Sequence, residues 1–175
     1  MVVSEGKPTT GRELLVLLYH EIRVLARQRL SGERPNHTLN TTALVNELYL
    51  RLAPSDQQFR GEGEFAAAAS QTMRRILVDH ARAHKCEKRG GSRETLQLSA
   101  LTFDICEGRM VGVEALDEAL SQLAQIDERQ ARVVEMRFFG GLQLQEIAAE
   151  LGVSCKTVKR DWATARSWLK ATLGS

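Results

Sequence analysis

The sequence predicts an all-α protein with two small helical domains joined by a linker, the C-terminal one a helix-turn-helix. Apolar residues recur at intervals of three and four through most of the 175 positions, as they do on one face of a helix. No segment alternates apolar and polar residues in the way that marks a half-buried strand. Aromatic residues make up only 5% of the chain and there are three prolines, which also favours helix.

Two helices are predicted before residue 53. The first spans residues 12–30, and its apolar positions 14, 15, 18, 22 and 25 form one stripe. The second runs from about Thr42 to Leu52, with Thr41 or Thr42 as its N-cap. Its inward face consists of Val45, Leu48, Tyr49 and Leu52.

A third, alanine-rich helix follows a loop at residues 54–64. It begins at Phe65 and ends before Gly90-Gly91. Its inward residues are Phe65, Ala69, Met73, Ile76 and Leu77. The next two dozen residues show no helical stripe and are long for a connection inside one compact domain. We therefore expect domains at 10–90 and 114–173 with a linker at 91–113.

The second half contains two further helices and then the sharpest local pattern of the chain. A helical stripe covers residues 114–123, and Asp127 with Gln130 resembles a capping box for a helix that reaches Phe139. After Gly140-Gly141, residues 142–169 read as a short helix, a tight turn and a second helix.

The tight turn and its flanks predict a helix-turn-helix. Gly152 occupies the turn, where a residue without Cβ is needed, and Ser154 caps the second helix. The inward positions on either side are Ile147, Ala148, Leu151, Val153, Val158 and Trp162. The outer face near the helix start then carries Cys155, Lys156, Thr157, Lys159 and Arg160. Such a helix can enter the major groove of DNA; a helix hairpin without a DNA role is the alternative.

A net charge of +2 hides a strong segregation of charge along the chain. Lysine and arginine dominate two segments, 74–93 and 154–170, while acidic residues dominate 104–128 between them. Two basic patches indicate a polyanionic partner, although solvated helix faces would give the same pattern. The acidic segment could also fold back onto either basic segment and mask it.

Together these segments resemble the extracytoplasmic-function (ECF) sigma factors, small relatives of the housekeeping bacterial sigma factor. The resemblance covers roughly residues 12–172. The segment DERQARVVEMRFFGGLQLQEIAAELGVSCKTVKRDWATARSWL is similar to their region four, TTALVNELYLRL to region 2.2, and EFAAAASQTMRRILVDHARAHKCEKRGG to regions 2.3 and 2.4. The pairing of both blocks is more specific than the helix-turn-helix alone.

The resemblance implies a protein of the cytoplasm that binds core RNA polymerase and directs promoter-specific initiation of transcription. A one-component helix-turn-helix regulator is the alternative function. In the sigma-factor interpretation the helix at 42–52 docks on the polymerase clamp helices through Asn46, Glu47 and Arg51, which otherwise form a solvated face.

The two basic segments then contact promoter DNA. The helix after Phe65 meets the minus-ten element as it melts, with Arg74, Arg75, Arg82 and Lys85 on phosphates. Phe59 and Arg60 are candidates for the pocket of an unstacked base, or Phe59 is a buried staple under the loop. Asp79-His80 reads a base edge, or Asp79 pairs with Arg75. The residues expected to contact the minus-thirty-five element are Ser154, Cys155, Lys156, Thr157, Lys159, Arg160 and Arg166.

Other chemistry is poorly supported. His80, His84 and Cys86 have a spacing that suggests zinc, but a fourth ligand is missing and the flanking cations would repel a metal. No glycine-rich phosphate loop, nucleophile elbow or carboxylate cluster is found, so we expect no enzymatic activity, metal or cofactor. Cys155 is either a reactive thiol at a helix start or a neutral groove-facing residue.

The N-terminus and the cysteines indicate a reducing compartment. Residues 1–13 have no apolar core, which argues against a signal peptide, and the longest apolar run near them, residues 14–19, is too short to span a membrane. The three cysteines contain no C-x-x-C pair.

One departure from the family pattern concerns regulation. ECF sigma factors usually carry acidic residues at the start of region 2.2, whereas TLNTTALVNE has only Glu47. Polymerase docking is therefore expected to be weak until a Ser/Thr kinase adds charge at Thr41 or Thr42, unless these threonines merely cap the helix. An anti-sigma factor is the other candidate regulator.

Overall fold

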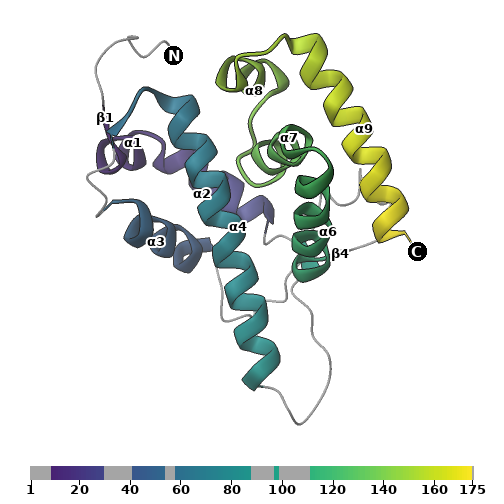
Figure 1. The fold of residues 1–175 in the computed structure, drawn as a ribbon. Coiled ribbons are helices and arrows are strands. Elements are labelled where there is room, and N and C mark those ends of the chain that lie inside the picture. Colours follow the sequence, from purple (N-terminus) through teal and green to yellow (C-terminus); the bar gives the residue numbers. More distant parts are fainter. Residues whose placement is uncertain (1–8, 30–40, 54–57, 88–96, 99–110, 175) are drawn as a thin grey trace.

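The computed structural model describes residues 9–29, 41–53, 58–87, 97–98 and 111–174 (Figure 1). Within these ranges the chain forms eight helices and two antiparallel pairs of two-residue strands, so the prediction of an all-α protein is confirmed. None of the described helices is long and apolar enough to cross a membrane.

The segment predicted as one helix is two helices, α1 (Gly11–Leu17) and α2 (Tyr19–Arg29). Thr10 caps α1 through a capping box with Glu13, whose carboxylate accepts from the Thr10 backbone N–H at 3.0 Å. Leu18 leaves the helical conformation with φ −98° and ψ 13°. The apolar stripe therefore serves two helices with different neighbours, since α1 packs against α3 and α4 whereas α2 packs mainly against α3.

Helix α3 (Thr41–Leu52) lies where the sequence predicts it, with a corrected inward face. Leu44, Val45, Leu48 and Leu52 are buried, whereas Tyr49, predicted to be inward, is 37% exposed. The helix already includes Thr41, so Thr41 and Thr42 are first-turn residues rather than the N-cap. The cap position, residue 40, lies outside the described residues.

Helix α4 (Glu62–Glu87) is the longest described helix and runs through the middle of the molecule (Figure 1). Its predicted inward residues Phe65, Ala69, Met73, Ile76 and Leu77 are all buried. Helix α3 covers one side of α4, while α6, α7 and α8 contact another. The strand pair β1 (Thr9–Thr10) and β2 (Gln58–Phe59) lies just before the start of α4 and ties the chain ahead of α1 to it.

The C-terminal half consists of α6 (Val113–Ile126), α7 (Glu128–Phe138), α8 (Leu144–Leu151) and α9 (Cys155–Leu173). Asp127 caps α7 as predicted, because its carboxylate accepts from the Gln130 backbone N–H at 3.1 Å. Gly140 and Gly141 separate α7 from α8, and Gly141 has the left-handed φ of 69°.

One cluster of buried apolar side chains extends through both halves of the chain. It includes Leu14 of α1, Leu77 of α4, Leu116 of α6, Phe138 of α7 and Leu169 of α9. The helices of the two predicted domains therefore pack against each other, and the domain boundary itself stays a prediction. Most of the predicted linker lies outside the described residues, but β3 (Gln97–Leu98) pairs with β4 (Val111–Gly112).

Candidate nucleic-acid interface

The helix-turn-helix is built as the sequence predicts. Gly152 ends α8 in the left-handed conformation, with φ 64° and ψ 31°. Ser154 caps α9 because its hydroxyl accepts from the Thr157 backbone N–H at 3.1 Å. Ile147 and Val158 are fully buried in a second apolar cluster, so the two helices have a fixed relative orientation.

The outer face of α9 is basic near its N-terminus. Lys156, Lys159, Arg160 and Arg166 are exposed, and the Arg160 side chain keeps 73% of its surface accessible. Thr157 is half-buried, and its hydroxyl lies 2.8 Å from that of Ser154.

The position of Cys155 differs from the predicted one. It was assigned to the outer face, but it is half-buried and packs against the second apolar cluster with Leu151 and Val153. Helical side chains lean toward the N-terminus, so a side chain at the first position covers the preceding turn. A direct contact of Cys155 with DNA therefore loses support.

Asp161 holds α9 in place and was missed by the sequence analysis. Its carboxylate is 3% exposed and accepts from Arg129 Nε on α7 at 2.6 Å. This hydrogen bond raises the pKa of Arg129. Arg160 Nε lies 3.9 Å from the same carboxylate. The sequence feature that could have indicated this role is an acidic residue three positions after Val158, on the inward face of a basic helix.

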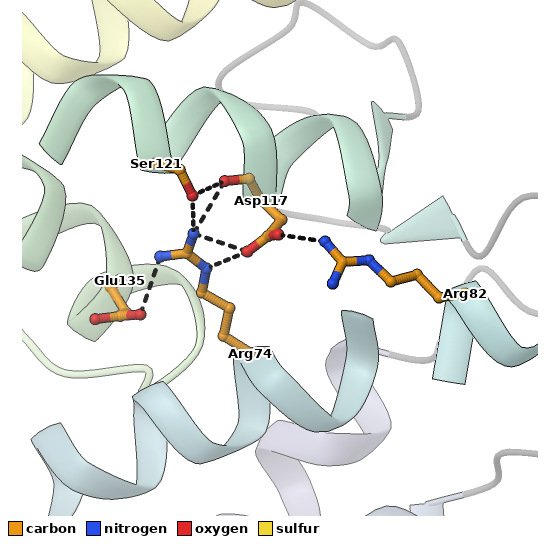
Figure 2. Close-up of polar contacts among 5 residues, drawn as sticks. All are labelled: Arg74, Arg82, Asp117, Ser121 and Glu135. Atoms are coloured by element: carbon orange, nitrogen blue, oxygen red, sulfur yellow. Dashed lines mark hydrogen bonds and ion pairs between the residues drawn. The ribbon is translucent and has the colours of Figure 1, made fainter. Parts of the chain in front are cut away.

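The basic face of α4 is only partly free. Arg75 is exposed, and Arg82 keeps 63% of its side-chain surface accessible. Arg74 is 17% exposed and turns toward α6 and α7, where it meets Asp117, Ser121 and Glu135 (Figure 2). In this arrangement Arg74 cannot contact a DNA phosphate. Lys85 belongs to α4, but its side chain lies outside the described part of the structure.

Asp79 pairs with α3 rather than with Arg75. Its carboxylate lies 3.2 Å from Arg51 Nη1, and Arg51 Nε donates to Glu47 at 2.9 Å. Burial disfavours the charge on Arg51, but the hydrogen bonds to Glu47 and Asp79 outweigh it and raise its pKa. His80, the other residue assigned to base reading, is half-buried.

The loop before α4 decides between the two interpretations of Phe59. Phe59 is fully buried, and its ring meets Phe65 edge to face with 5.3 Å between centroids. The structure therefore shows a buried staple, and the ring cannot stack on a base as it stands. The Arg60 side chain is 87% exposed. The Arg60 backbone N–H donates to Glu64 at 2.7 Å, which lowers the pKa of Glu64.

The polar face of α3 carries the residues assigned to polymerase docking. Asn46 is exposed, and Glu47 and Arg51 form an ion pair on the same face. Leu50, which the sequence analysis missed, is 64% exposed between them. Its signal was an apolar residue out of phase with the buried stripe.

The threonines at the start of α3 have no acidic neighbour in the first turn of the helix. Thr42 is exposed, and Thr41 is half-buried. The two positions therefore differ in accessibility.

The described residues do not form a zinc site from His80, His84 and Cys86. The side chains of His84 and Cys86 lie outside them, and no cluster of metal-ligating side chains occurs among those described.

Comparison with known proteins bears on the whole chain. Residues 1–175 match the family described as ECF sigma factor. No curated protein and no solved structure gives a significant match. The match confirms the resemblance seen in the two sequence blocks and supersedes the one-component regulator. The chain belongs to the ECF sigma factor family, non-enzymatic proteins that direct transcription initiation at promoter DNA with core RNA polymerase.

Proposed function

We propose that residues 10–90 bind core polymerase and the minus-ten element, that residues 91–113 form a linker, and that residues 114–173 bind the minus-thirty-five element. The observation that carries the DNA assignment is the start of α9, a capped helix N-terminus with Lys156, Lys159 and Arg160 exposed. We also infer a location in the cytoplasm, because core polymerase and promoter DNA are found there.

The start of α9 suits DNA for two reasons. Its exposed cations neutralise phosphates, and the positive end of the helix dipole adds to the attraction. Arginine and lysine at the first turns of a recognition helix can also donate to guanine in the major groove. Arg166 lies more than two turns further on and suits the phosphate backbone at the edge of the site.

Helix α4 supplies the second DNA contact in this proposal. Arg75 and Arg82 are exposed on α4, and Arg60 is exposed on the loop that leads into it. These cations, with Lys85 further along the helix, would bind the phosphates of the strand that separates. Phe59 is left out of this contact because it is buried.

Helix α3 supplies the polymerase contact. Its outer face combines an amide at Asn46, an ion pair between Glu47 and Arg51, and the exposed apolar side chain of Leu50. An apolar centre with a polar rim is the usual composition of a protein–protein contact. Leu50→Ser should therefore weaken core binding without lowering the melting temperature, because the side chain is 64% exposed.

Of the two candidate regulators, the structure of α3 supports a Ser/Thr kinase better than an anti-sigma factor. A phosphate on Thr42 would lie in the first helical turn, where negative charge is favoured and where no acidic residue occurs. Thr42→Asp should therefore raise affinity for core polymerase, whereas Thr42→Ala should not. Gln145→Glu on the exposed face of α8 is the charge control. Tight core binding by the unmodified protein, with no gain from Thr42→Asp, would leave the threonines as structural residues.

The DNA assignment is tested by run-off transcription with core polymerase and a promoter library. Replacement of Lys156, Lys159 or Arg160 by alanine should reduce initiation in each case. Where a base contact is lost, the free energy of promoter binding should weaken by roughly 1–3 kcal/mol. A lost phosphate contact should instead weaken all promoters and reduce the salt dependence. Arg27→Ala removes the same charge from the exposed face of α2 and is the matched control. Three alanine variants that initiate like the parent would refute the assignment.

A further inference from the structure

We propose that the free protein is autoinhibited by a latch in which α6 and α7 hold Arg74 of α4, so that promoter DNA binds fully only after α4 separates from them. The proposal rests on the proposed role of α4 in DNA binding. It adds a closed state, names the residues that hold it, and assigns Arg74 a second role.

The geometry of Arg74 is that of an occupied binding site. Arg74 Nε donates to Asp117 Oδ1 at 2.8 Å, and Nη2 donates to the Asp117 carbonyl at 2.9 Å and to the Ser121 hydroxyl at 3.1 Å. Nη1 donates to Glu135 at 3.2 Å. All three nitrogens of the guanidinium are therefore engaged, as Figure 2 shows. The pairs are 12–21% exposed, so salt screens them less than it screens a surface pair.

Asp117 offers α4 the chemistry of a phosphate. Its two oxygens bind two different cations of α4, Arg74 at 2.7 Å and Arg82 at 3.4 Å. Carboxylate and phosphate oxygens both accept charge-assisted hydrogen bonds from a guanidinium, so they compete for the same donors. The acid comes from the same chain, at a high effective concentration, and an incoming duplex must displace it.

Next to the latch, the turn between α7 and α8 approaches α4 closely. Ser70 is buried on α4, one turn before Arg74, and a Cβ placed on Gly140 would overlap its hydroxyl oxygen. The turn between α7 and α8 therefore lies directly on α4. Because helices cover this face, DNA can reach Arg74 only when the two halves move apart. The apparent affinity for DNA is then reduced by the fraction of molecules that are open.

The contact between α4 and α8 also contains a repulsive element. A Cβ on Gly63 would lie 3.0 Å from a carboxylate oxygen of Glu150 on α8, and Glu64 is the neighbouring residue. Burial, followed by the charge of Glu64, raises the pKa of Glu150, and together they outweigh the opposing charges of Arg132 and Arg60. Ionised Glu150 therefore works against closure, and Glu150→Gln should strengthen the closed state.

The test compares three full-length proteins with the parent. Asp117→Asn with Glu135→Gln removes both latch charges and keeps the side-chain shapes. Glu118→Gln with Glu128→Gln makes the same charge change at exposed positions of the same two helices and is the matched control. Glu150→Gln shifts the equilibrium in the opposite direction and leaves the ion pairs of Arg74 intact.

Closure is measured first on the free protein, without polymerase or DNA. Small-angle scattering of the parent should give a radius of gyration of about 16 Å, as expected for a compact chain of this length. Hydrogen exchange should show protection of the α4 backbone around Arg74. The latch variant should expand and lose this protection, whereas the control should match the parent.

Binding to a fork-junction promoter DNA is measured next. The latch variant should bind roughly tenfold more tightly than the parent, within the usual range of allosteric coupling, and Glu150→Gln should bind more weakly. A latch variant that stays compact, or that expands without any gain in DNA affinity, would overturn the proposal. If the latch variant does not fold, unchanged closure and DNA affinity in Glu150→Gln would overturn it. Failure of every variant to initiate with core polymerase would count against the proposed function instead, because closure is read without polymerase.

Discussion

Replacement of Phe59 by alanine separates a structural role of this ring from a role in DNA melting. The side chain is fully buried and packs edge to face on Phe65. A Cβ placed on Gly11 would come within 3.2 Å of the Phe59 ring, so α1 also closes over it. Truncation leaves a cavity and removes the aromatic pair, which costs about 3–5 kcal/mol. For a chain of this length the melting temperature should fall by about 6–20 °C.

The assay is thermal unfolding followed by circular dichroism, combined with run-off transcription well below the melting temperature. Phe59→Leu refills most of the cavity and should cost roughly 1–2 kcal/mol while it retains promoter opening. Arg60→Ala, beside it on the exposed loop, should change stability by no more than about 0.5 kcal/mol. If Phe59→Ala melts like the parent but cannot open a promoter, the ring contacts DNA and the staple interpretation is wrong.

Three further predictions concern the C-terminal half. Val158→Asp should abolish cooperative unfolding of α8 and α9, because it places a charge in a fully buried position, whereas Lys156→Asp on the exposed face should not. Arg129→Met should lower the melting temperature more than Asp161→Asn, because it leaves a carboxylate that is 3% exposed without its partner at 2.6 Å. Burial raises the pKa of Glu150 above 4.5, so its ionised form costs stability at neutral pH. Stability should therefore rise as the pH falls through that raised pKa toward 4.5, and Glu150→Gln should melt higher at pH 7 and lose this dependence.

The features that local rules control were predictable from the sequence. The left-handed turn at Gly152, the cap at Ser154 and the cap at Asp127 each depend on residues within three positions of one another. The buried stripe of α4 was predictable for the same reason, because helical periodicity decides which side chains share a face.

The features that long-range partners control were not predictable. Arg74 meets Asp117 and Glu135, which are 43 and 61 residues away, so only the tertiary arrangement shows that its charge is used inside the protein. The break at Leu18 was not predictable either, because no glycine or proline marks it in the sequence. Segregated charge did indicate that the acidic segment could meet a basic one, and Asp117 does so with Arg74 and Arg82.

Charge at the start of α3 and the latch on α4 act on two different equilibria, docking on polymerase and opening of the protein. Changes at separated sites without shared partners usually add in free energy. Here Arg51 connects the two, because it bonds to Glu47 on α3 and to Asp79 on α4 at 2.9 and 3.2 Å.

A polymerase surface that draws Arg51 outward would leave Asp79 with two exposed helical neighbours on α4, Arg75 four positions before it and Arg82 three positions after it. Of these two, only Arg82 also holds Asp117, so a shift of Arg82 toward Asp79 is the route that reaches the latch. Arg82 would then leave Asp117, and one of the two ion pairs that join α4 to Asp117 of α6 would be lost. Docking and opening should therefore be coupled through Asp79. If so, the latch variant should also bind core polymerase more tightly than the parent. This gain should be larger in the parent background than with Asp79→Asn, where this route is absent. Equal gains in both backgrounds would mean that the two equilibria are independent.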